Sequence, residues 1–381
     1  MSTEKLYYQD AYTRQFTATV RFCEAVGDRF VVLLDRTAFF PEEGGQSADT
    51  GTLDGIAVLD VKETAGEIQH FLAAPLEPGT VITGVLDWPE RFRKMQSHTA
   101  EHVLSGLIYR RFGYDNTGFH LAEDEFIMDC GGELSAEDLA WLEQSANEAI
   151  WADHPVSTGF PAPEELAALS YRSKLDLTEG VRIVHIEDID DCACCAPHLS
   201  GTGQIGLVRL CEAMRHRGGM RIRAKAGSDA LRDYQTRAAA DRRISESLSV
   251  PQSEIAEGVE KLLAERDALK QQLAEARLAA LETLMDAFEL TDGNLLLFAD
   301  ADMEGLRMLV NRGVAYAGGL CAAFTGTDGD YRFVIGSRHL DTRAWFAEHR
   351  EALKARGGGK PEMVSGSCAA GRAEIEALLG T

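Results

Sequence analysis

No uninterrupted apolar run in this 381-residue chain approaches the ~20 residues that a membrane-spanning helix requires. The first eight residues, Met-Ser-Thr-Glu-Lys-Leu-Tyr-Tyr, also lack the apolar core of a signal peptide. The chain is not poor in hydrophobic residues, which make up 45% of it, and this content excludes a disordered protein. We therefore expect a globular, cytoplasmic protein without membrane contact, and the length predicts roughly two to four domains.

Positive charge is scarce, since 38 Lys and Arg residues stand against 61 Asp and Glu residues, for a net charge of −23. This balance argues against a protein that coats nucleic acid through bulk electrostatics, although a local basic face remains compatible with it. Two basic groups occur: one is Arg209, Arg215, Arg217, Arg221, Arg223 and Lys225, and the other is Arg91, Arg93, Lys94, Arg110 and Arg111. Each group alone is typical of a solvated surface, so each needs a second argument before it indicates a ligand.

The eight cysteines are unevenly spread, with Cys192, Cys194 and Cys195 close together and the others far apart. A disulfide framework belongs to small secreted chains and would be spaced more evenly. In a cytoplasmic chain, the group at 192–195 instead indicates metal-binding or reactive thiols.

The pattern of short runs and turns predicts an α+β protein with four parts. Residues 1–89 hold β-branched or alternating runs at 17–23, 30–35, 56–62, 67–72 and 81–86, separated by Gly and Pro turns, which predicts an antiparallel β-barrel. Residues 90–228 form the next part, with helices at 90–112 and 135–151 and strands at 125–129, 181–186, 205–211 and 219–225. These two parts are expected to be an N-terminal barrel and an α+β domain.

The second half of the chain has a different pattern. In residues 229–290 the apolar positions step by four and three as in a heptad repeat, and Pro251 interrupts the helix, so we expect a helical hairpin or coiled coil. Residues 291–381 predict an α/β unit, with strands at 294–298, 319–326 and 331–337, helices at 302–312, 344–355 and 370–379, and a flexible glycine loop at 357–361.

Two local pairs indicate a metal site. His98 and His102 are four residues apart on an expected helix, so that both imidazoles leave the same face. Cys194 and His198 supply a thiolate and an imidazole from one short loop. Three nitrogens and one sulfur suit tetrahedral zinc. Cys192 and Cys195 are rival thiolates, and spacing alone does not rank them.

The same helix offers an alternative interpretation. His98-Thr99-Ala100-Glu101-His102 matches H-x-x-E-H, the inverted zinc-protease signature, with Glu101 as general base. Such a protease leaves one coordination position for water. The pair of Cys194 and His198 argues against it, because a fourth protein ligand would fill that position.

Taken in order, the motifs of this chain resemble a known family. They are Asp-Arg-Thr-Ala-Phe-Phe-Pro-Glu-Glu-Gly-Gly-Gln at 35–46, the His and Cys/His pairs, Thr-Gly-Gln-Ile-Gly at 202–206 and Arg-Gly-Gly-Met-Arg at 217–221. This order is similar to the editing region of alanyl-tRNA synthetase and to its freestanding relatives, the AlaX proteins, in their long form. The C-terminal part, with Gly-Gly-Gly-Lys-Pro-Glu-Met at 357–363, resembles the DHH-associated domain that closes alanyl-tRNA synthetase.

The resemblance implies that His98, His102, Cys194 and His198 are the zinc ligands, and that Thr37 and Gln46 line the amino-acid pocket. A threonine hydroxyl can form a hydrogen bond with the serine hydroxyl, which alanine lacks. A site built on such a hydrogen bond discriminates strongly between serine and alanine. Asp129 is a candidate partner for a ligand histidine. One departure from the family is the loop Cys195-Ala196-Pro197, where relatives have Gly-Gly-Thr, and this puts the selectivity of the loop in question.

The implied activity is trans-editing: hydrolysis of tRNA(Ala) carrying serine, or secondly glycine, at a zinc ion that positions or polarises the ester or activates water. The segment 209–225 would bind phosphates, domain 291–381 would bind the tRNA body, and the coiled coil with the C-terminal domain would form a homodimer. The chain begins at the barrel, so we expect no aminoacylation domain. It also has no Asp-His-His triad and no Gly-x-x-x-x-Gly-Lys-Ser/Thr loop, so neither phosphoesterase activity nor ATP is implied.

Two alternatives remain open beside the protease. The chain could be a tRNA-binding factor with a structural zinc, or it could act on a different aminoacyl-tRNA, since threonyl-tRNA editing uses a related site. The sequence nominates no general base.

Overall fold

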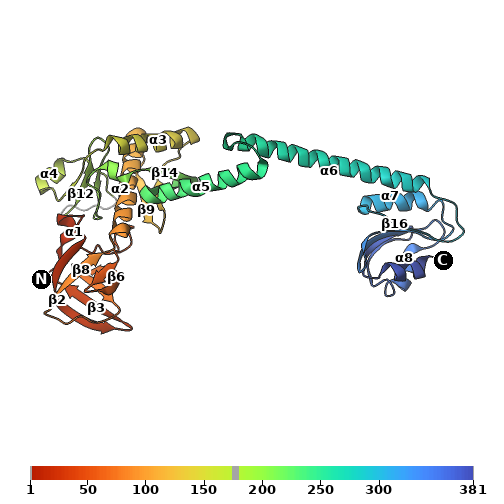
Figure 1. The fold of residues 1–381 in the computed structure, drawn as a ribbon, viewed down its shortest axis with the longest axis horizontal. Coiled ribbons are helices and arrows are strands. Elements are labelled where there is room, and N and C mark those ends of the chain that lie inside the picture. The colour runs from red at the N-terminus through yellow and green to blue at the C-terminus, as the bar shows by residue number, and fades with distance from the viewer. Residues whose placement is uncertain (1, 174–179, 381) are drawn as a thin grey trace. The chain divides into compact units, whose positions relative to one another are not determined.

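The structure is a computed structural model, and it describes residues 2–173 and 180–380. It divides into two compact units, one ending at Asp241 and one beginning at Arg242, and each is described by itself (Figure 1). The mixed α+β class expected from the sequence is confirmed. None of the described helices is both long enough and apolar enough to cross a membrane.

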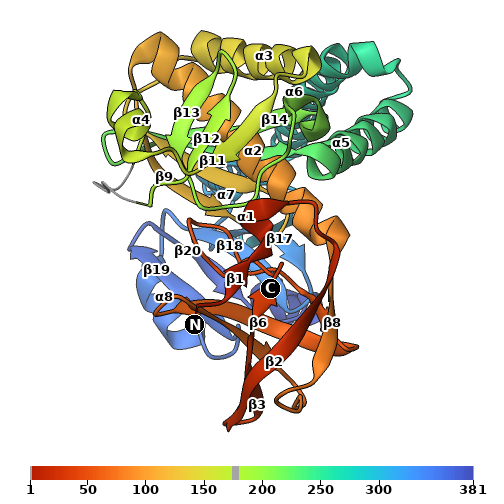
Figure 2. The ribbon, with the colours of Figure 1, turned by 90° about the vertical axis from the view of Figure 1, so that its left-hand side faces the viewer.

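The first unit opens with a closed antiparallel ring of six strands (Figure 2). In spatial order these are β2 (Gln15–Val26), β3 (Arg29–Leu34), β7 (Glu67–Leu72), β6 (Ile56–Thr64), β5 (Gly51–Leu53) and β8 (Val81–Leu86). Alternate residues such as Val32, Leu34 and Leu72 point inward and are fully buried. The expected strands are all present, whereas β5, with three residues, is too short to show alternation in the sequence.

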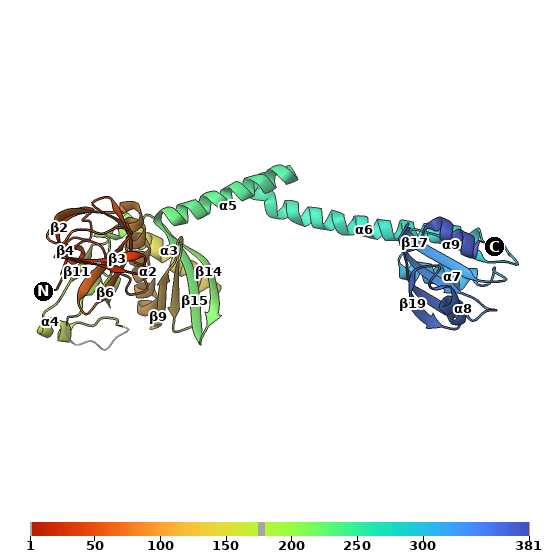
Figure 3. The ribbon, with the colours of Figure 1, turned by 90° about the horizontal axis from the view of Figure 1, so that it is seen from below.

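The long helix α2 (Trp88–Phe112) follows the ring and carries two of the candidate ligands. Asp87 caps its first turn by accepting from the Glu90 N–H, Pro89 lies within that turn, and Gly113, at φ 70°, ends the helix in the left-handed region. α2 packs against α3 (Ala136–Ala152) and against a four-stranded sheet (Figure 3). The strands of that sheet, in spatial order, are β14 (Val208–His216), β15 (Gly219–Ala226), β10 (Phe126–Cys130) and β9 (Asn116–Leu121).

Three smaller features complete the site's surroundings. A second, three-stranded sheet joins β11 (Val156–Gly159), β12 (Ile183–Ile186) and β13 (Asp190–Ala193), and α4 (Pro163–Ala168) follows β11 (Figure 2). β13 leads directly into Cys194 and then to the short helix η1 (Thr202–Ile205). Near the N-terminus, β1 (Glu4–Lys5) pairs with β4 (Arg36–Thr37) and precedes α1 (Leu6–Gln9).

Two helices, α5 (Gly227–Leu248) and α6 (Ile255–Asp286), occupy the expected helical segment, with the turn η2 (Gln252–Glu254) after Pro251. The heptad positions Val259, Leu262, Leu269 and Leu273 of α6 are 38% to 57% exposed. Their pairing into a coiled coil stays a prediction.

The second unit holds a five-stranded sheet. In spatial order its strands are β16 (Leu295–Phe298), β17 (Cys321–Thr327), β18 (Asp330–Gly336), β20 (Met363–Cys368) and β19 (Ala355–Lys360). α7 (Met303–Gly313) and the end of α6 pack on one face, and α8 (Thr342–His349) and α9 (Arg372–Leu379) supply side chains to the core on the other.

The expectation of a flexible loop at 357–361 is wrong. Gly357, Gly358 and Gly359 lie in β19, which pairs along its whole length with β20. A Cβ added at Gly359 would lie 2.2 Å from the carbonyl oxygen of Met363, so this strand needs glycine for its close approach. Glycines carry no side-chain alternation, and the strand was therefore invisible in the sequence.

Candidate metal centre and cavity

The structure brings together the four residues that the sequence singled out as metal ligands, here called the four-ligand cluster: His98, His102, Cys194 and His198. One candidate ligand atom from each lies within 4.8 Å of those of the other three. Sγ of Cys194 is 3.5 Å from Nε2 of His98 and 3.4 Å from Nε2 of His198. The three imidazoles are at most 3% exposed. The cluster could therefore hold one metal ion.

Each histidine of the cluster is oriented through its Nδ1 atom. Nδ1 of His98 lies 2.9 Å from Oε1 of Gln46, and Nδ1 of His102 lies 3.0 Å from Oδ2 of Asp190. Nδ1 of His198 lies 3.1 Å from Oγ1 of Thr99. Such contacts fix the ring and leave Nε2 for a metal. The contacts around the cluster are therefore of the kind that hold the histidine rings of a metal site in fixed orientations.

Burial shifts the pKa of two members of the cluster. It raises the pKa of the Cys194 thiol and lowers the pKa of His198, to which the neighbouring His102 and His98 also contribute. Neutral imidazoles keep their lone pairs available to a cation, whereas the thiol must lose its proton when it binds one. The donor set of three nitrogens and one sulfur fits zinc.

The loop Cys195-Ala196-Pro197, which departs from the family, is fixed by hydrogen bonds and by packing on its buried side. The Arg182 guanidinium donates to the carbonyl oxygens of Cys194, at 2.9 Å, and Ala196, at 2.8 Å. Ala196 is itself fully buried and packs with Tyr7 and Phe40 of the N-terminal region. Packing and Arg182 therefore position a loop that lacks the family's glycines.

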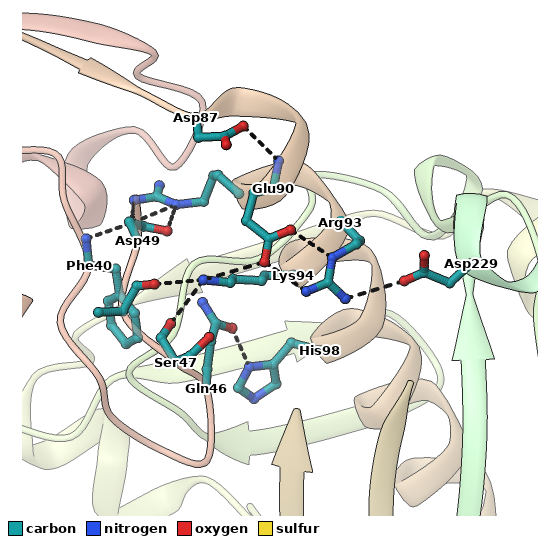
Figure 4. Close-up of polar contacts among 12 residues, drawn as sticks. Phe40, Gln46, Ser47, Asp49, Asp87, Glu90, Arg93, Lys94, His98 and Asp229 are labelled. Carbon is teal, nitrogen blue, oxygen red and sulfur yellow. Dashed lines mark hydrogen bonds and ion pairs between the residues drawn. The ribbon is translucent and has the colours of Figure 1, made fainter. Parts of the chain in front are cut away.

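Residues 38–49, which carry Gln46, are held against α2 by two buried cations, one of which, Lys94, is labelled in Figure 4. Arg91 forms a buried ion pair with Asp49, and the Lys94 ammonium donates to the carbonyl oxygens of Ala48, at 2.6 Å, and Ser47, at 3.3 Å. The expectation of a solvated basic face is wrong for these two residues, which are 1% and 2% exposed. They bring the amide of Gln46 to His98.

Thr37 lies in the interior rather than among the residues that line the cavity. Nδ1 of His70 donates to the Val32 carbonyl at 3.2 Å, so Nε2 accepts the Thr37 hydroxyl at 2.8 Å. Thr37 Oγ1 in turn accepts from the Phe39 N–H at 3.1 Å. Burial lowers the pKa of His70 to about 4, which keeps this ring neutral.

A cavity of about 440 Å³ opens beside the four-ligand cluster. Its walls include the aromatic rings of Tyr8, Phe119 and Phe160 and the charged groups of Glu101, Arg172 and Arg182. This volume and this mixture of apolar walls with a few polar groups are typical of small-molecule sites.

Asp190 takes the role for which Asp129 was a candidate. Asp129 pairs instead with Arg221, at 2.7 and 2.8 Å, on the four-stranded sheet. Asp190 contacts His102 and also accepts two hydrogen bonds from Arg172, at 2.8 and 2.7 Å. Its place four residues before Cys194 is the feature of the sequence that points to it.

Most basic side chains of segment 209–225 are paired with acids, and the expectation that this segment binds phosphates stays a prediction. Five of its basic residues form ion pairs: Arg209 with Asp233, Arg215 with Glu133, Arg221 with Asp129, Arg223 with Glu125 and Glu212, and Lys225 with Asp124.

Comparison with known proteins supports the resemblance. Residues 2–90 match the family of class II (A) tRNA synthetases, and residues 181–224 match the second additional domain of threonyl and alanyl tRNA synthetase. The chain is 37% identical over 236 residues to the alanyl-tRNA editing protein AlaX-M of Methanosarcina acetivorans, covering 95% of that protein and 57% of this one. It belongs to the alanyl-tRNA editing family.

Other members and relatives share parts of the chain. The AlaX-L protein of Pyrococcus horikoshii is 33% identical over 216 residues, which is 54% of each protein. The alanine–tRNA ligase of Halobacterium salinarum is 31% identical over 359 residues, which is 88% of this chain and 38% of the ligase. The chain thus spans about half of the AlaX-L relative and little more than a third of the ligase.

Proposed function

We propose that this protein hydrolyses the ester between a wrongly attached small amino acid and tRNA(Ala), with serine as the first substrate and glycine as the second. The observation that carries the proposal is the four-ligand cluster beside the cavity, in a chain of the editing family. The same cluster disfavours a metallopeptidase, because four protein side chains converge on one point.

We propose zinc as the metal of the cluster, because three imidazoles and one thiol in a buried tetrad suit it better than hard oxygen-seeking cations. When bound, zinc supplies Lewis acidity toward the ester carbonyl. Gln46, Asp190 and Thr99 orient the three imidazoles. The Nε2 amide of Gln46 is buried without a hydrogen-bond partner among the described residues, although Gln46 is not among the residues that line the cavity.

The part of Thr37 in serine selection stays a proposal, because its hydroxyl is buried and Thr37 is not among the residues that line the cavity. Its own hydrogen is donated to His70, so a serine hydroxyl that reaches it would have to donate to Thr37 Oγ1. Alanine has no such hydrogen to donate, and a site built on that bond would reject it.

The second unit supports binding to the body of tRNA. Arg332, Ser367 and Arg356 lie in one cross-strand row over β18, β20 and β19, and Lys360 lies on the same face. All four are exposed, and no described acid forms an ion pair with the three cations. In a chain of net charge −23, unpaired cations on one sheet face favour phosphate contacts.

A deacylation assay with Ser-, Gly- and Ala-tRNA(Ala) tests the proposal. We expect the wild type to hydrolyse the first two faster than the third, and Cys194→Ala to lose the activity together with the metal. The matched control is Cys211→Ala on β14, which should retain both. Full hydrolysis by metal-free Cys194→Ala would overturn the metal chemistry. tRNA binding without hydrolysis by the wild type would favour the tRNA-binding factor.

A further inference from the structure

Glu101 is a buried acid that the proposed chemistry has not used. It lies on α2 between His98 and His102, is 4% exposed and lines the cavity. The sequence singled it out only as the base of a protease signature.

The Glu101 carboxylate is held in one orientation. Ser105, one turn further along α2, and Asn116, the first residue of β9, both donate to its Oε1 atom. Asn116 is itself fixed, because its Oδ1 accepts from the Gly118 N–H at 2.9 Å. The other oxygen, Oε2, has no hydrogen-bond partner within residues 2–173 and 180–380, and is the part of the side chain available to a ligand.

The cation that acts on this carboxylate from nearby, Arg172, is shared with Asp190. Two arginines share the cavity wall, but Arg172 forms its two short contacts with Asp190, and Arg182 is bound to the carbonyl oxygens of Cys194 and Ala196. No ion pair joins Glu101 to a cation in the part of the chain that the structure describes. Two neutral donors bind only one of its oxygens, and a buried carboxylate gains most from a cationic partner, so the site favours a cation that enters the cavity.

We propose that Glu101 binds the α-ammonium group of the aminoacyl ester, an inference that rests on the proposed function. Every substrate of that class carries this cation one carbon from the scissile carbonyl. An ammonium donor and a carboxylate acceptor form a charge-assisted hydrogen bond. Because Glu101 lies between two ligands on the same helix, holding the ammonium there keeps the neighbouring carbonyl close to the four-ligand cluster.

The decisive comparison uses two substrates that differ at one group: Ser-tRNA(Ala) and tRNA(Ala) esterified with glyceric acid, in which a hydroxyl replaces the ammonium. Glu101→Gln keeps an Oε1 acceptor for Ser105 and Asn116 but removes the charge. We expect kcat/KM for Ser-tRNA(Ala) to fall by about 10- to 100-fold, as for loss of a hydrogen bond to a charged group. The glyceryl ester should be hydrolysed equally by wild type and variant.

Controls separate this role from others. Glu137→Gln, an exposed acid in the first turn of α3, should leave both substrates unaffected. Binding of 3′-serylamino-3′-deoxyadenosine, which is not hydrolysed, should weaken in Glu101→Gln by a similar factor, with metal content and thermal unfolding unchanged.

Equal loss on both substrates, no loss on either, or loss of metal would overturn the assignment to the ammonium group and leave the proposed function intact. Failure of the wild type to hydrolyse either ester would overturn both proposals.

Discussion

The amide oxygen of Gln46 lies 2.9 Å from Nδ1 of His98, and this contact joins a loop of the N-terminal region to the four-ligand cluster on α2. Figure 4 shows the contact together with the loop's anchor, the Lys94 ammonium. The position of a candidate metal ligand therefore depends on a segment more than 50 residues away in the sequence.

The first prediction concerns this contact. Gln46→Ala removes the acceptor that orients His98, and we expect the affinity for zinc to fall by about 10- to 100-fold with the fold retained. Competition with a chromophoric chelator measures the zinc affinity of the variant and of the wild type. The control Gln144→Ala, on the exposed side of α3, should bind zinc as the wild type does. Wild-type affinity in Gln46→Ala would show that the contact does not support the metal.

The second prediction concerns the anchor of the same loop. Arg91→Ala leaves the buried Asp49 carboxylate without its cation, and we expect the first unit to lose about 3–5 kcal/mol of unfolding free energy. Urea unfolding measures the loss. Arg110→Ala, at an exposed position of the same helix, should change stability by no more than about 0.5 kcal/mol. A loss in Arg91→Ala as small as in this control would contradict a structural ion pair.

The third prediction follows from the neutral state of His70. Its pKa falls from 6.5 to about 4 on burial, so the unfolded chain binds a proton between these pH values and the folded chain does not. Stability should therefore fall as the pH drops below 6.5, by about 2 kcal/mol at pH 5 from this residue alone. His70→Asn should lose that part of the pH dependence, and His120→Gln, at an exposed site, should keep it. An unchanged pH dependence in His70→Asn would contradict the shift.

The fourth prediction concerns the sheet face of the second unit. In the full chain, Arg332→Ala and Arg356→Ala should each weaken tRNA binding and reduce the slope of log affinity against log salt by about 1. Filter binding at several salt concentrations measures both effects. Arg343→Ala, on α8, serves as the control. Equal slopes in all three variants and the wild type would place the tRNA contact elsewhere.

Sequence periodicity was sufficient for the elements with strong local signals. The spacing of apolar residues and Gly113 were enough to predict helix α2. The helix starts at Trp88, two residues before the predicted start. The pairing of His98 with His102 and of Cys194 with His198 was also visible, because both spacings are short. These features depend on residues within one or two turns of each other, where backbone geometry alone decides which side chains are neighbours.

Only the tertiary structure decided which distant residues support those pairs. Asp190 rather than Asp129 contacts His102, and Arg91 and Lys94, which look like surface charges in the sequence, are buried against the loop of Gln46. The glycines of β19 form a strand because β20 lies beside them, although no side-chain pattern marks it. The physical reason is the same in each case. Burial and hydrogen bonding between segments far apart in the chain depend on how those segments pack, and the local sequence does not specify which distant segment will be the partner.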